Sequence, residues 1–364
     1  MKIIISYASA GSGHFRAALA IYHCLKEIRP GLNILLADNL KYANPLFAKI
    51  YTLGYTILVT RFKFAWAVAF WITSVKFFCC ILNLICRLNC RKFINFLLEE
   101  QPDIIFTTHF LPAGIVDYLK QKGKIDSRLL TVITDFGLHP LWVLKNCGDY
   151  FVASEYTRNC LIRRGVGPEN IKVSGIPIDS SFSTGTPPFL HRSASSGKER
   201  AGLTVLLVTG SFGFALIEKA VKALYSRVNI LAVCGKNQRL YDKLKRKRYP
   251  GVDLFGFTED MHALMSRSDI IITKPGGLTI AEALAMQLPM VFIGGIPGQE
   301  TENARILEDC GCAINAKDLK SLKGLIIDLK RNPEKLCLMR DNIRKIRKPD
   351  ATGDICRYVC SGSV

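Results

Sequence analysis

The chain has 364 residues, which is long enough for two domains that each bury a core. Lys and Arg outnumber Asp and Glu by 49 to 30, and the formal net charge of +19 favours an anionic partner: nucleic acid, anionic lipid or a phosphorylated substrate. The thirteen cysteines are odd in number and include no C-x-x-C pair, so neither a zinc site nor a disulfide framework is indicated. This cysteine pattern leads us to expect a reduced, cytoplasmic protein. We also expect no signal peptide, because Met1-Lys2 leads directly into a short apolar strand.

The first half of the chain predicts alternating strands and helices. Residues 2–6 read as a buried strand, the glycine-rich run 8–14 follows, and helical periodicity extends over 15–28. Further apolar runs alternate with helical segments, which indicates parallel βαβ units. These runs are 34–37, 104–107, 129–133, 150–153 and 171–173.

The pattern restarts after a segment rich in Pro, Ser, Gly and charge. We therefore predict an N-terminal domain over 1–185, a linker over 186–200 and a C-terminal domain over 201–364. Each domain should be a Rossmann-like α/β fold, with a ligand cleft between the carboxyl ends of their strands. The strands expected in the second half are 203–209, 230–234, 253–255, 269–273, 290–293 and 313–315.

A strand, a Pro-Gly-Gly turn and a helix over 271–284 form the sharpest local motif. Gly276 and Gly277 let the backbone approach a ligand, and the helix N-terminus that follows offers N–H groups to a phosphate. Glu282, about one turn into that helix, is placed to bind a ribose diol. The alternative is an ordinary capping turn with a solvated glutamate.

The next strand is followed by a polar loop that opens another helix. Gln299, Glu300 and Asn303 in this loop carry amide and carboxylate groups of the kind that bind sugar hydroxyls. The alternative is a helix start with acidic residues in its first turn.

Three polar residues follow strands of the first half and are candidates for acid–base chemistry. His14 closes the glycine-rich run, and a histidine there could act as a general base. His109 and Asp135 follow two other strands and could orient His14 or line an acceptor site, with Asp135 as the alternative base. A helix-capping histidine and an Asx-turn aspartate are the competing interpretations.

The combined motifs resemble the monogalactosyldiacylglycerol synthases and bacterial diacylglycerol glucosyltransferases, relatives of the peptidoglycan N-acetylglucosaminyltransferase. The resemblance covers most of the chain and is strongest over 257–313. It is also carried, in the same order and spacing, by Ser9-Ala10-Gly11-Ser12-Gly13-His14, Thr134-Asp135, His139-Pro140-Leu141-Trp142, Gly175-Ile176-Pro177-Ile178 and Cys234-Gly235-Lys236-Asn237. The family often has a longer glycine run where this chain has Gly210-Ser211-Phe212-Gly213-Phe214.

The resemblance implies a GT-B fold, a UDP-sugar as donor substrate, and an inverting transfer that uses no metal or other cofactor. It implies that the C-terminal domain binds the donor and the N-terminal domain the lipid acceptor. The backbone of Phe257 would contact the uracil, Gly276, Gly277, Leu278 and Thr279 the diphosphate, Glu282 the ribose, and Gln299 with Glu300 the hexose. Gly13, Ser211 and Asn303 complete the predicted donor site, while His109, His139 and Trp142 are assigned to the acceptor side.

The segment 39–98 contains no acidic residue but eight basic ones among many aromatic side chains. Its apolar runs 64–72 and 77–86, with Trp66 and Trp71, are typical of helices that lie in an anionic membrane interface. A membrane-spanning helix and plain core helices are the alternatives. Nucleic acid is disfavoured because the basic residues alternate with apolar runs and form no base-reading module.

These observations predict a peripheral enzyme at the cytoplasmic face of the membrane. It would transfer a hexose from a UDP-sugar to the hydroxyl of diacylglycerol or a related lipid. The alternatives are a UDP-sugar epimerase, transfer of N-acetylglucosamine to another lipid-linked acceptor, and a non-enzymatic protein that binds lipid or nucleotide.

Overall fold

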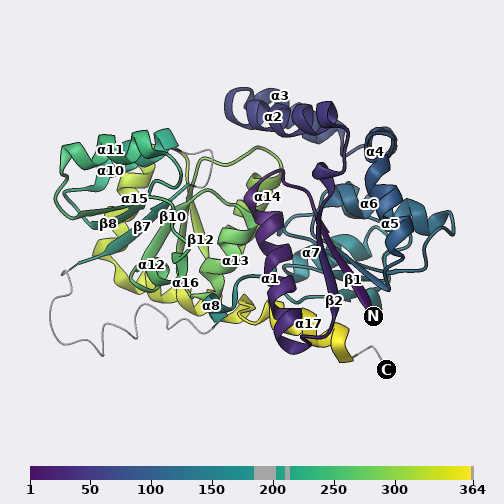
Figure 1. The fold of residues 1–364 in the computed structure, drawn as a ribbon. Helices are drawn as coiled ribbons and strands as arrows, with labels where there is room; N and C mark the ends of the chain where they lie inside the picture. The colour runs from purple at the N-terminus through teal and green to yellow at the C-terminus, as the bar shows by residue number, and fades with distance from the viewer. Residues whose placement is uncertain (184–201, 210–213, 362–364) are drawn as a thin grey trace. The chain divides into compact units, whose positions relative to one another are not determined.

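The computed structural model describes residues 1–183, 202–209 and 214–361. The chain divides into two compact units, each built around one sheet (Figure 1). Unit 1 comprises Met1–Ser180, Ile296–Gln299 and Asp350–Val364, and unit 2 comprises Ser181–Gly295 and Glu300–Pro349. The linker predicted over 186–200 lies outside the described residues.

The sheet of unit 1 has six parallel strands in the order β2-β1-β3-β4-β5-β6. Consecutive strands all run in the same direction because helices or longer connections return the chain to the starting edge. The strands are β1 (Lys2–Tyr7), β2 (Asn33–Asp38), β3 (Ile104–Thr107), β4 (Arg128–Val132), β5 (Asp149–Phe151) and β6 (Ile171–Lys172).

Helices cover both faces of this sheet, so its strands are apolar on both sides. Ile3 and Ile5 point to the face covered by α1 (Ser12–Ile28) and α17 (Ala351–Ser361), while Ile4 packs against the opposite face. The remaining helices of unit 1 are η1 (Asn39–Lys41), α2 (Pro45–Arg61), α3 (Lys63–Ile72), α4 (Lys76–Asn89), α5 (Arg91–Glu100), α6 (Phe110–Gln121), η2 (Pro140–Trp142), α7 (Glu155–Ile162) and η3 (Pro168–Asn170).

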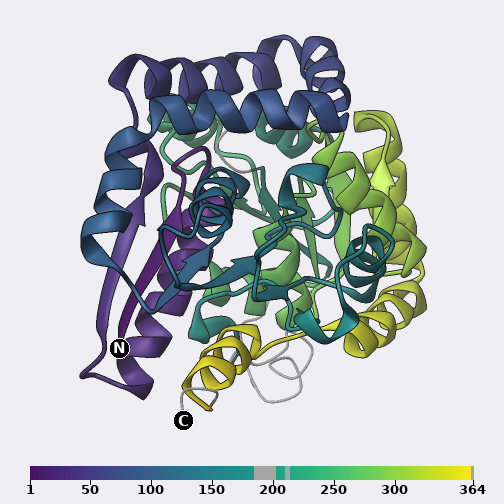
Figure 2. The ribbon, with the colours of Figure 1, turned by 90° about the vertical axis from the view of Figure 1, so that its right-hand side faces the viewer.

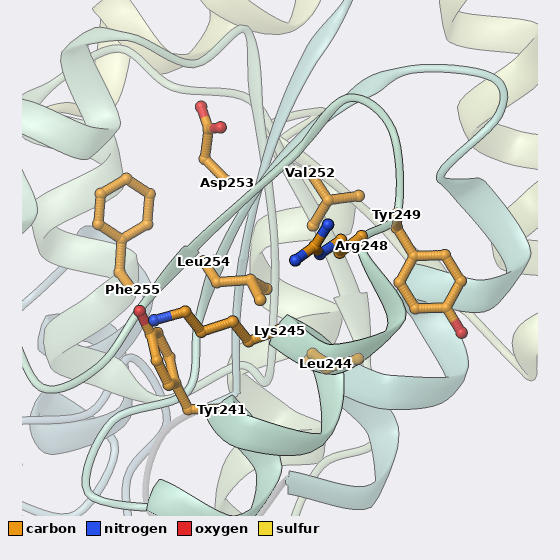
Figure 3. A pocket seen from close by; sticks show the side chains of 9 residues that line it. All are labelled: Tyr241, Leu244, Lys245, Arg248, Tyr249, Val252, Asp253, Leu254 and Phe255. Carbon is orange, nitrogen blue, oxygen red and sulfur yellow. The ribbon is translucent and has the colours of Figure 1, made fainter.

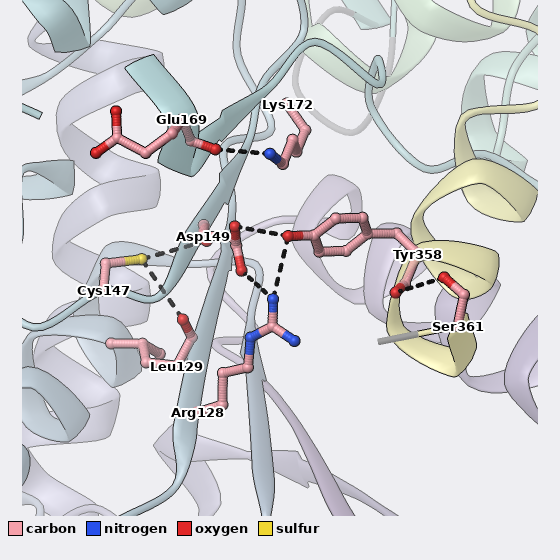
Figure 4. A network of polar contacts seen from close by, with 8 residues as sticks. All are labelled: Arg128, Leu129, Cys147, Asp149, Glu169, Lys172, Tyr358 and Ser361. Carbon is pink, nitrogen blue, oxygen red and sulfur yellow. Dashed lines mark hydrogen bonds and ion pairs between the residues drawn. The ribbon is translucent and has the colours of Figure 1, made fainter. Parts of the chain in front are cut away.

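The C-terminal helix α17 packs on the first sheet, although the sequence placed all of 201–364 in the second domain. Its apolar side chains, including Ile355 and Val359, join the core around β1 and α1. Figure 4 shows a polar anchor beside them: Tyr358 Oη donates to Asp149 Oδ1 (2.9 Å) and accepts from Arg128 Nη2 (3.1 Å). Arg128 also pairs with Asp149 at 2.5 Å, so strands β4 and β5 hold the helix through one network.

The sheet of unit 2 also has six parallel strands, in the order β12-β11-β10-β7-β8-β9. β-branched and leucine side chains of its central strands pack against α10, α11, α15 and α16 on one face. The strands are β7 (Thr204–Val208), β8 (Asn229–Val233), β9 (Val252–Phe255), β10 (Ile270–Thr273), β11 (Met290–Ile293) and β12 (Ala313–Ala316). The helices are α8 (Ser180–Ser183), α10 (Phe214–Leu224), α11 (Gln238–Lys247), α12 (Met261–Ser266), α13 (Gly277–Ala285), α14 (Gln299–Asp309), α15 (Leu319–Arg331) and α16 (Pro333–Ile346).

The predicted fold class is confirmed. All twelve predicted strands form, with boundaries that differ from the prediction by at most two residues. The strands are easy to recognise in the sequence because both faces of a parallel sheet are buried, which leaves continuous apolar runs.

Candidate functional site

In unit 1, four polar side chains gather where parallel strands end; we call them the histidine cluster (His14, Thr108, His109 and Thr134). His14 lies in the first turn of α1 after β1, Thr108 and His109 follow β3, and Thr134 follows β4. The turn before His14 depends on Gly11, whose φ of +114° is strained for any residue with a side chain. The strand order β1-β3-β4 therefore brings together residues that lie far apart in the sequence.

Hydrogen bonds fix which nitrogen of His14 carries the hydrogen. Nδ1 lies 2.7 Å from the carbonyl oxygen of Thr108, which can only accept, so Nδ1 must be the donor. The hydroxyl of Thr134 also lies 2.9 Å from Nδ1, and the hydroxyl of Thr108 donates to the backbone oxygen of His14 at 2.9 Å. The neutral ring consequently keeps its lone pair on Nε2, where a general base needs it.

His109 has the opposite tautomer. Its side chain caps α6: Nδ1 accepts the N–H of Leu111 at 3.0 Å, so the hydrogen of the neutral ring is on Nε2. The ring is 3% exposed and meets the ring of His14 edge to face, with centroids 4.6 Å apart. His109 therefore caps α6. The sequence showed only that this histidine follows a strand.

Both rings of the histidine cluster are neutral at physiological pH. Burial lowers the pKa of His14 to about 4, partly opposed by the Thr108 carbonyl. Burial, and then the proximity of His14, lower the pKa of His109 well below its ordinary value. A base with such a low pKa is weak, so removing a proton from an alcohol would have to accompany the bond formation that acidifies that alcohol.

Asp135 follows β4 directly after Thr134 and is buried, with 7% of the residue exposed. Its Oδ2 accepts a hydrogen bond of 2.6 Å from Nε2 of Gln299, which belongs to the short segment of unit 1 at 296–299. Gln299 was predicted to bind the hexose, and here its amide nitrogen is directed to a carboxylate.

His139 and Trp142 lie on the short helix η2, which follows the same strand. His139 caps η2 through Nδ1 (3.2 Å to the N–H of Leu141), and its Nε2 lies 3.3 Å from the hydroxyl of Thr73 at the end of α3. Burial lowers the pKa of His139 to about 4. Trp142 is only 3% exposed and packs in the core of unit 1. We had predicted that it contacts the acceptor or the membrane, and its burial does not fit an exposed membrane contact.

In unit 2, the turn between β10 and α13 carries the second group of predicted site residues; we call residues 274–279 the donor turn. Gly276 is the N-cap of α13, and no side chain caps the helix. Among the described residues, no acceptor is found for the N–H groups of Gly277, Leu278 and Thr279. Three such amides and the positive end of the helix dipole suit an anionic ligand such as a diphosphate.

A charged pair borders the donor turn. Lys274 Nζ forms an ion pair with Oε1 of Glu300, whose side chain is 6% exposed, against 24% for that of Lys274. Asn303 is buried, and its Nδ2 donates to the carbonyl oxygen of Pro275 at 3.1 Å. Glu300 and Asn303 therefore support the donor turn. The sequence had suggested only that they bind the hexose. Lys274 was missed, although it directly precedes the Pro-Gly-Gly motif.

The other predicted donor residues are distributed over the chain as follows. Glu282 is buried in α13, with 7% exposed. Phe257 follows β9 and is 56% exposed, with Lys236 Nζ 5.3 Å from its ring centre. Gly13 lies in the first turn of α1 in unit 1. Ser211 falls outside the described residues.

The helices α2, α3 and α4 carry most of the exposed large apolar side chains. Of the 19 such residues found among the described ones, 15 lie between Leu46 and Leu88; we call these 15 the exposed apolar face. Helices α2 and α3 contact each other (Figure 1), and Figure 2 shows this group of helices from another side. The members are Leu46, Ile50, Leu53, Ile57, Phe62, Phe64, Val68, Trp71, Val75, Phe77, Phe78, Ile81, Leu84, Ile85 and Leu88.

The two tryptophans predicted for the membrane differ in environment. Trp71 is 71% exposed, whereas Trp66 is half-buried and its indole N–H donates to the carbonyl oxygen of Pro297 at 3.1 Å. In the described part of the chain, no single helix has the length and apolarity needed to cross a membrane. Lys63–Ile72 and Phe77–Asn89 meet that test only as a pair, which is bent by 100°.

Two further features of the described residues bear on ligand binding. A hollow of about 420 Å³ lies between α11 and the edge strand β9 of unit 2 (Figure 3). Lys245 and Arg248 border it, and it includes none of the predicted site residues. No group of three or more His, Cys, Asp or Glu side chains in the described ranges could hold a metal ion.

Each half of the chain matches the model of a known protein family. Residues 14–178 match the family model of monogalactosyldiacylglycerol (MGDG) synthase, and residues 204–352 match the glycosyltransferase family 28 C-terminal domain. Together the two matches show that the chain is a glycosyltransferase that uses a UDP-sugar. This glycosyltransferase is also similar to a processive diacylglycerol beta-glucosyltransferase of Staphylococcus aureus, with 29% identity over 98% of this chain and 91% of that protein.

Solved structures of other proteins share the fold of this glycosyltransferase. Acinetobacter baumannii MurG has a TM-score of 0.61 at 18% identity, covering 99% of this chain and 100% of that one. A Neisseria meningitidis UDP-GlcNAc 2-epimerase bound to UDP-GlcNAc has a TM-score of 0.61 at 12% identity, with the same coverages. The predicted GT-B architecture is thereby confirmed, and these likenesses bear on the fold alone.

Proposed function

We propose that this enzyme transfers a hexose from a UDP-sugar to the hydroxyl of diacylglycerol at the surface of an anionic membrane. The observation that carries the proposal is the uncapped N-terminus of α13, in a domain that matches the family 28 C-terminal model. The first unit of the same chain matches the MGDG synthase model. The relative of 29% identity is named for transfer of glucose to diacylglycerol, which supports the same class of donor and acceptor.

The donor turn would bind the diphosphate. When the bond from the anomeric carbon to the β-phosphate oxygen breaks, the electron pair stays on that oxygen, and negative charge grows on the departing UDP. The amides of Gly277, Leu278 and Thr279 already point out of the helix end, so they can stabilise this charge without reorganising. Glu282, in the same helix, would bind the ribose, and Phe257 the base.

His14 would receive the proton of the acceptor hydroxyl. Its tautomer leaves Nε2 free of hydrogen, and its low pKa keeps the ring neutral throughout the physiological range. The acceptor oxygen would form the new bond to the anomeric carbon opposite the departing oxygen, and the configuration would invert. Asp135 is the alternative base, and its hydrogen bond with Gln299 makes it the weaker candidate.

The exposed apolar face would bring the enzyme to its lipid acceptor. Phe64, Trp71 and Phe77 are 83%, 71% and 67% exposed, and basic residues such as Lys63 lie beside them. Aromatic side chains among lysines and arginines suit the boundary between acyl chains and anionic headgroups. We place the enzyme peripherally, at the cytoplasmic face of the membrane.

The activity is tested by offering the purified protein UDP-glucose, UDP-galactose or UDP-N-acetylglucosamine with diacylglycerol in anionic vesicles, and analysing the lipids by mass spectrometry. We expect one donor to give a hexosyl-diacylglycerol. His14→Ala should abolish turnover, whereas His23→Ala, which changes an exposed histidine on the same helix, should not. The absence of glycolipid with every donor, or a donor epimerised without transfer, would contradict the proposal.

The membrane role is tested by sedimentation with vesicles of phosphatidylglycerol and phosphatidylcholine. We expect the double variant Phe64→Glu, Trp71→Glu to reduce the bound fraction. The matched control is Leu338→Glu, which changes a side chain of 62% exposure on α16 of unit 2. Equal binding of both variants would show that the exposed apolar face does not contact the membrane.

A further inference from the structure

We propose that Lys274 is a catalytic residue that binds the departing diphosphate, and that the buried Glu300 is a positioning residue that holds Lys274 beside the donor turn. This inference deepens the proposed function and rests on it. The sequence motif over 271–284 predicts roles for its glycines and for Glu282 but none for the lysine that precedes them.

The position of Lys274 is the first step of the argument. A methyl group added at Gly276, the N-cap of α13, would lie 3.9 Å from Lys274 Nζ and 3.7 Å from Glu300 Oε1. The ammonium group is therefore within a few ångströms of the backbone that opens the helix. A ligand bound by the helix amides would meet a full positive charge as well as the partial charge of the dipole.

The second step is the burial of Glu300. Its side chain is 6% exposed, and a carboxylate taken out of water is costly unless a cation or several hydrogen bonds compensate it. The pairing with Lys274 provides that cation. An ammonium has three N–H donors in total, and one bond to Glu300 leaves two for phosphate oxygens. The pair thus fixes the direction of a lysine side chain that would otherwise have many rotamers.

The third step is the chemistry. In the transfer, the bond between the anomeric carbon and the β-phosphate oxygen breaks, and that oxygen keeps the electron pair. The acceptor oxygen forms the new bond, and its proton passes to His14 Nε2. Lys274 exchanges no proton in this step; its N–H groups stabilise the negative charge as it develops on the β-phosphate. Such stabilisation lowers the barrier because it is stronger in the transition state than in the ground state.

The test is calorimetric titration of the full-length protein with UDP and with uridine, together with turnover in vesicles. In Lys274→Met we expect UDP affinity to fall at least tenfold and uridine affinity to stay unchanged. We expect kcat to fall by about 10² to 10³, as for the loss of one preorganised donor to a developing anion. Lys274→Arg, which keeps the charge, should retain part of both.

Glu300→Gln separates positioning from direct contact. The lysine is still present in this variant, so UDP affinity should fall less than in Lys274→Met, while kcat still falls. Lys274→Met removes the cation beside a buried carboxylate and could unfold. The double variant Lys274→Met, Glu300→Gln therefore provides a second measurement with both charges removed. Lys335→Met, which breaks an exposed pair with Asp328 in the same unit, is the matched control and should behave like the wild type.

The outcomes distinguish the two proposals. Wild-type UDP affinity in the folded double variant, with UDP still bound by the wild-type protein, would overturn the role of Lys274 and leave the proposed function intact. An equal loss of UDP and uridine affinity would also overturn it, because a phosphate contact cannot affect a ligand without phosphate. No UDP binding by the wild-type protein would overturn both.

Discussion

The neutral state of His14 predicts a specific loss of stability in acid. The ordinary pKa of histidine is 6.5, and burial lowers that of His14 to about 4. Between these values the unfolded chain binds a proton that the folded chain does not, so stability falls as the pH falls from about 6.5 to about 4. At pH 7.5 the effect is negligible, because the ring is neutral in both states.

The magnitude follows from the two pKa values. Between pH 7.5 and pH 5.0, the protonation of His14 in the unfolded state should cost about 2 kcal/mol of unfolding free energy. His14→Gln cannot be protonated, so its stability should fall by about 2 kcal/mol less over this interval than that of the wild type. A constant destabilisation by the substitution itself does not affect this difference.

Urea unfolding at pH 7.5 and at pH 5.0 measures this difference in unfolding free energy between the wild type and His14→Gln. All three tryptophans, Trp66, Trp71 and Trp142, belong to unit 1, so their fluorescence reports the unit that contains His14. His23→Gln, on the exposed side of the same helix, should keep the pH dependence of the wild type. Identical pH dependence in wild type and His14→Gln would refute the argument, because the ring would then not be held neutral by burial.

Three more predictions concern the reaction and the fold. The acid limb of kcat/KM should have its midpoint near pH 4, since His14 stays neutral down to its own pKa, and a midpoint near 6.5 in a pH–rate profile would contradict this. Gly276→Ala should melt like the wild type, because the added carbon meets only ordinary contacts of 3.7 and 3.9 Å. It should nevertheless bind UDP about tenfold more weakly in calorimetry. The control is Gly324→Ala, whose added carbon lies in open space on α15. Tyr358→Phe should destabilise unit 1 by about 1–2 kcal/mol in urea unfolding, since it removes the hydroxyl between Asp149 and Arg128, and an effect no larger than that of Tyr22→Phe would contradict it.

The sequence by itself determined the two parallel sheets and the turns at their carboxyl ends. Strands buried on both faces are continuous apolar runs such as Ile3–Ile5 and Ile270–Ile272, and these are visible without any partner. The Pro-Gly-Gly turn and the motif ending in His14 are local signals, because strand, glycine and helix follow one another directly. Composition alone also revealed the segment 39–98 as unusual.

Only the tertiary structure decided what depends on distant partners. The tautomer of His14 is set by a carbonyl 94 residues away, and the pairing of Lys274 with Glu300 spans 26 residues. Trp142 has the same amphipathic side chain as Trp71, but one is in a core and the other is exposed. Helix α17 follows the second sheet in sequence and packs on the first, because its apolar side matches the face around Ile3 and Ile5. Local patterns carry no record of such partners, since packing and hydrogen bonding are decided by which surfaces meet after folding.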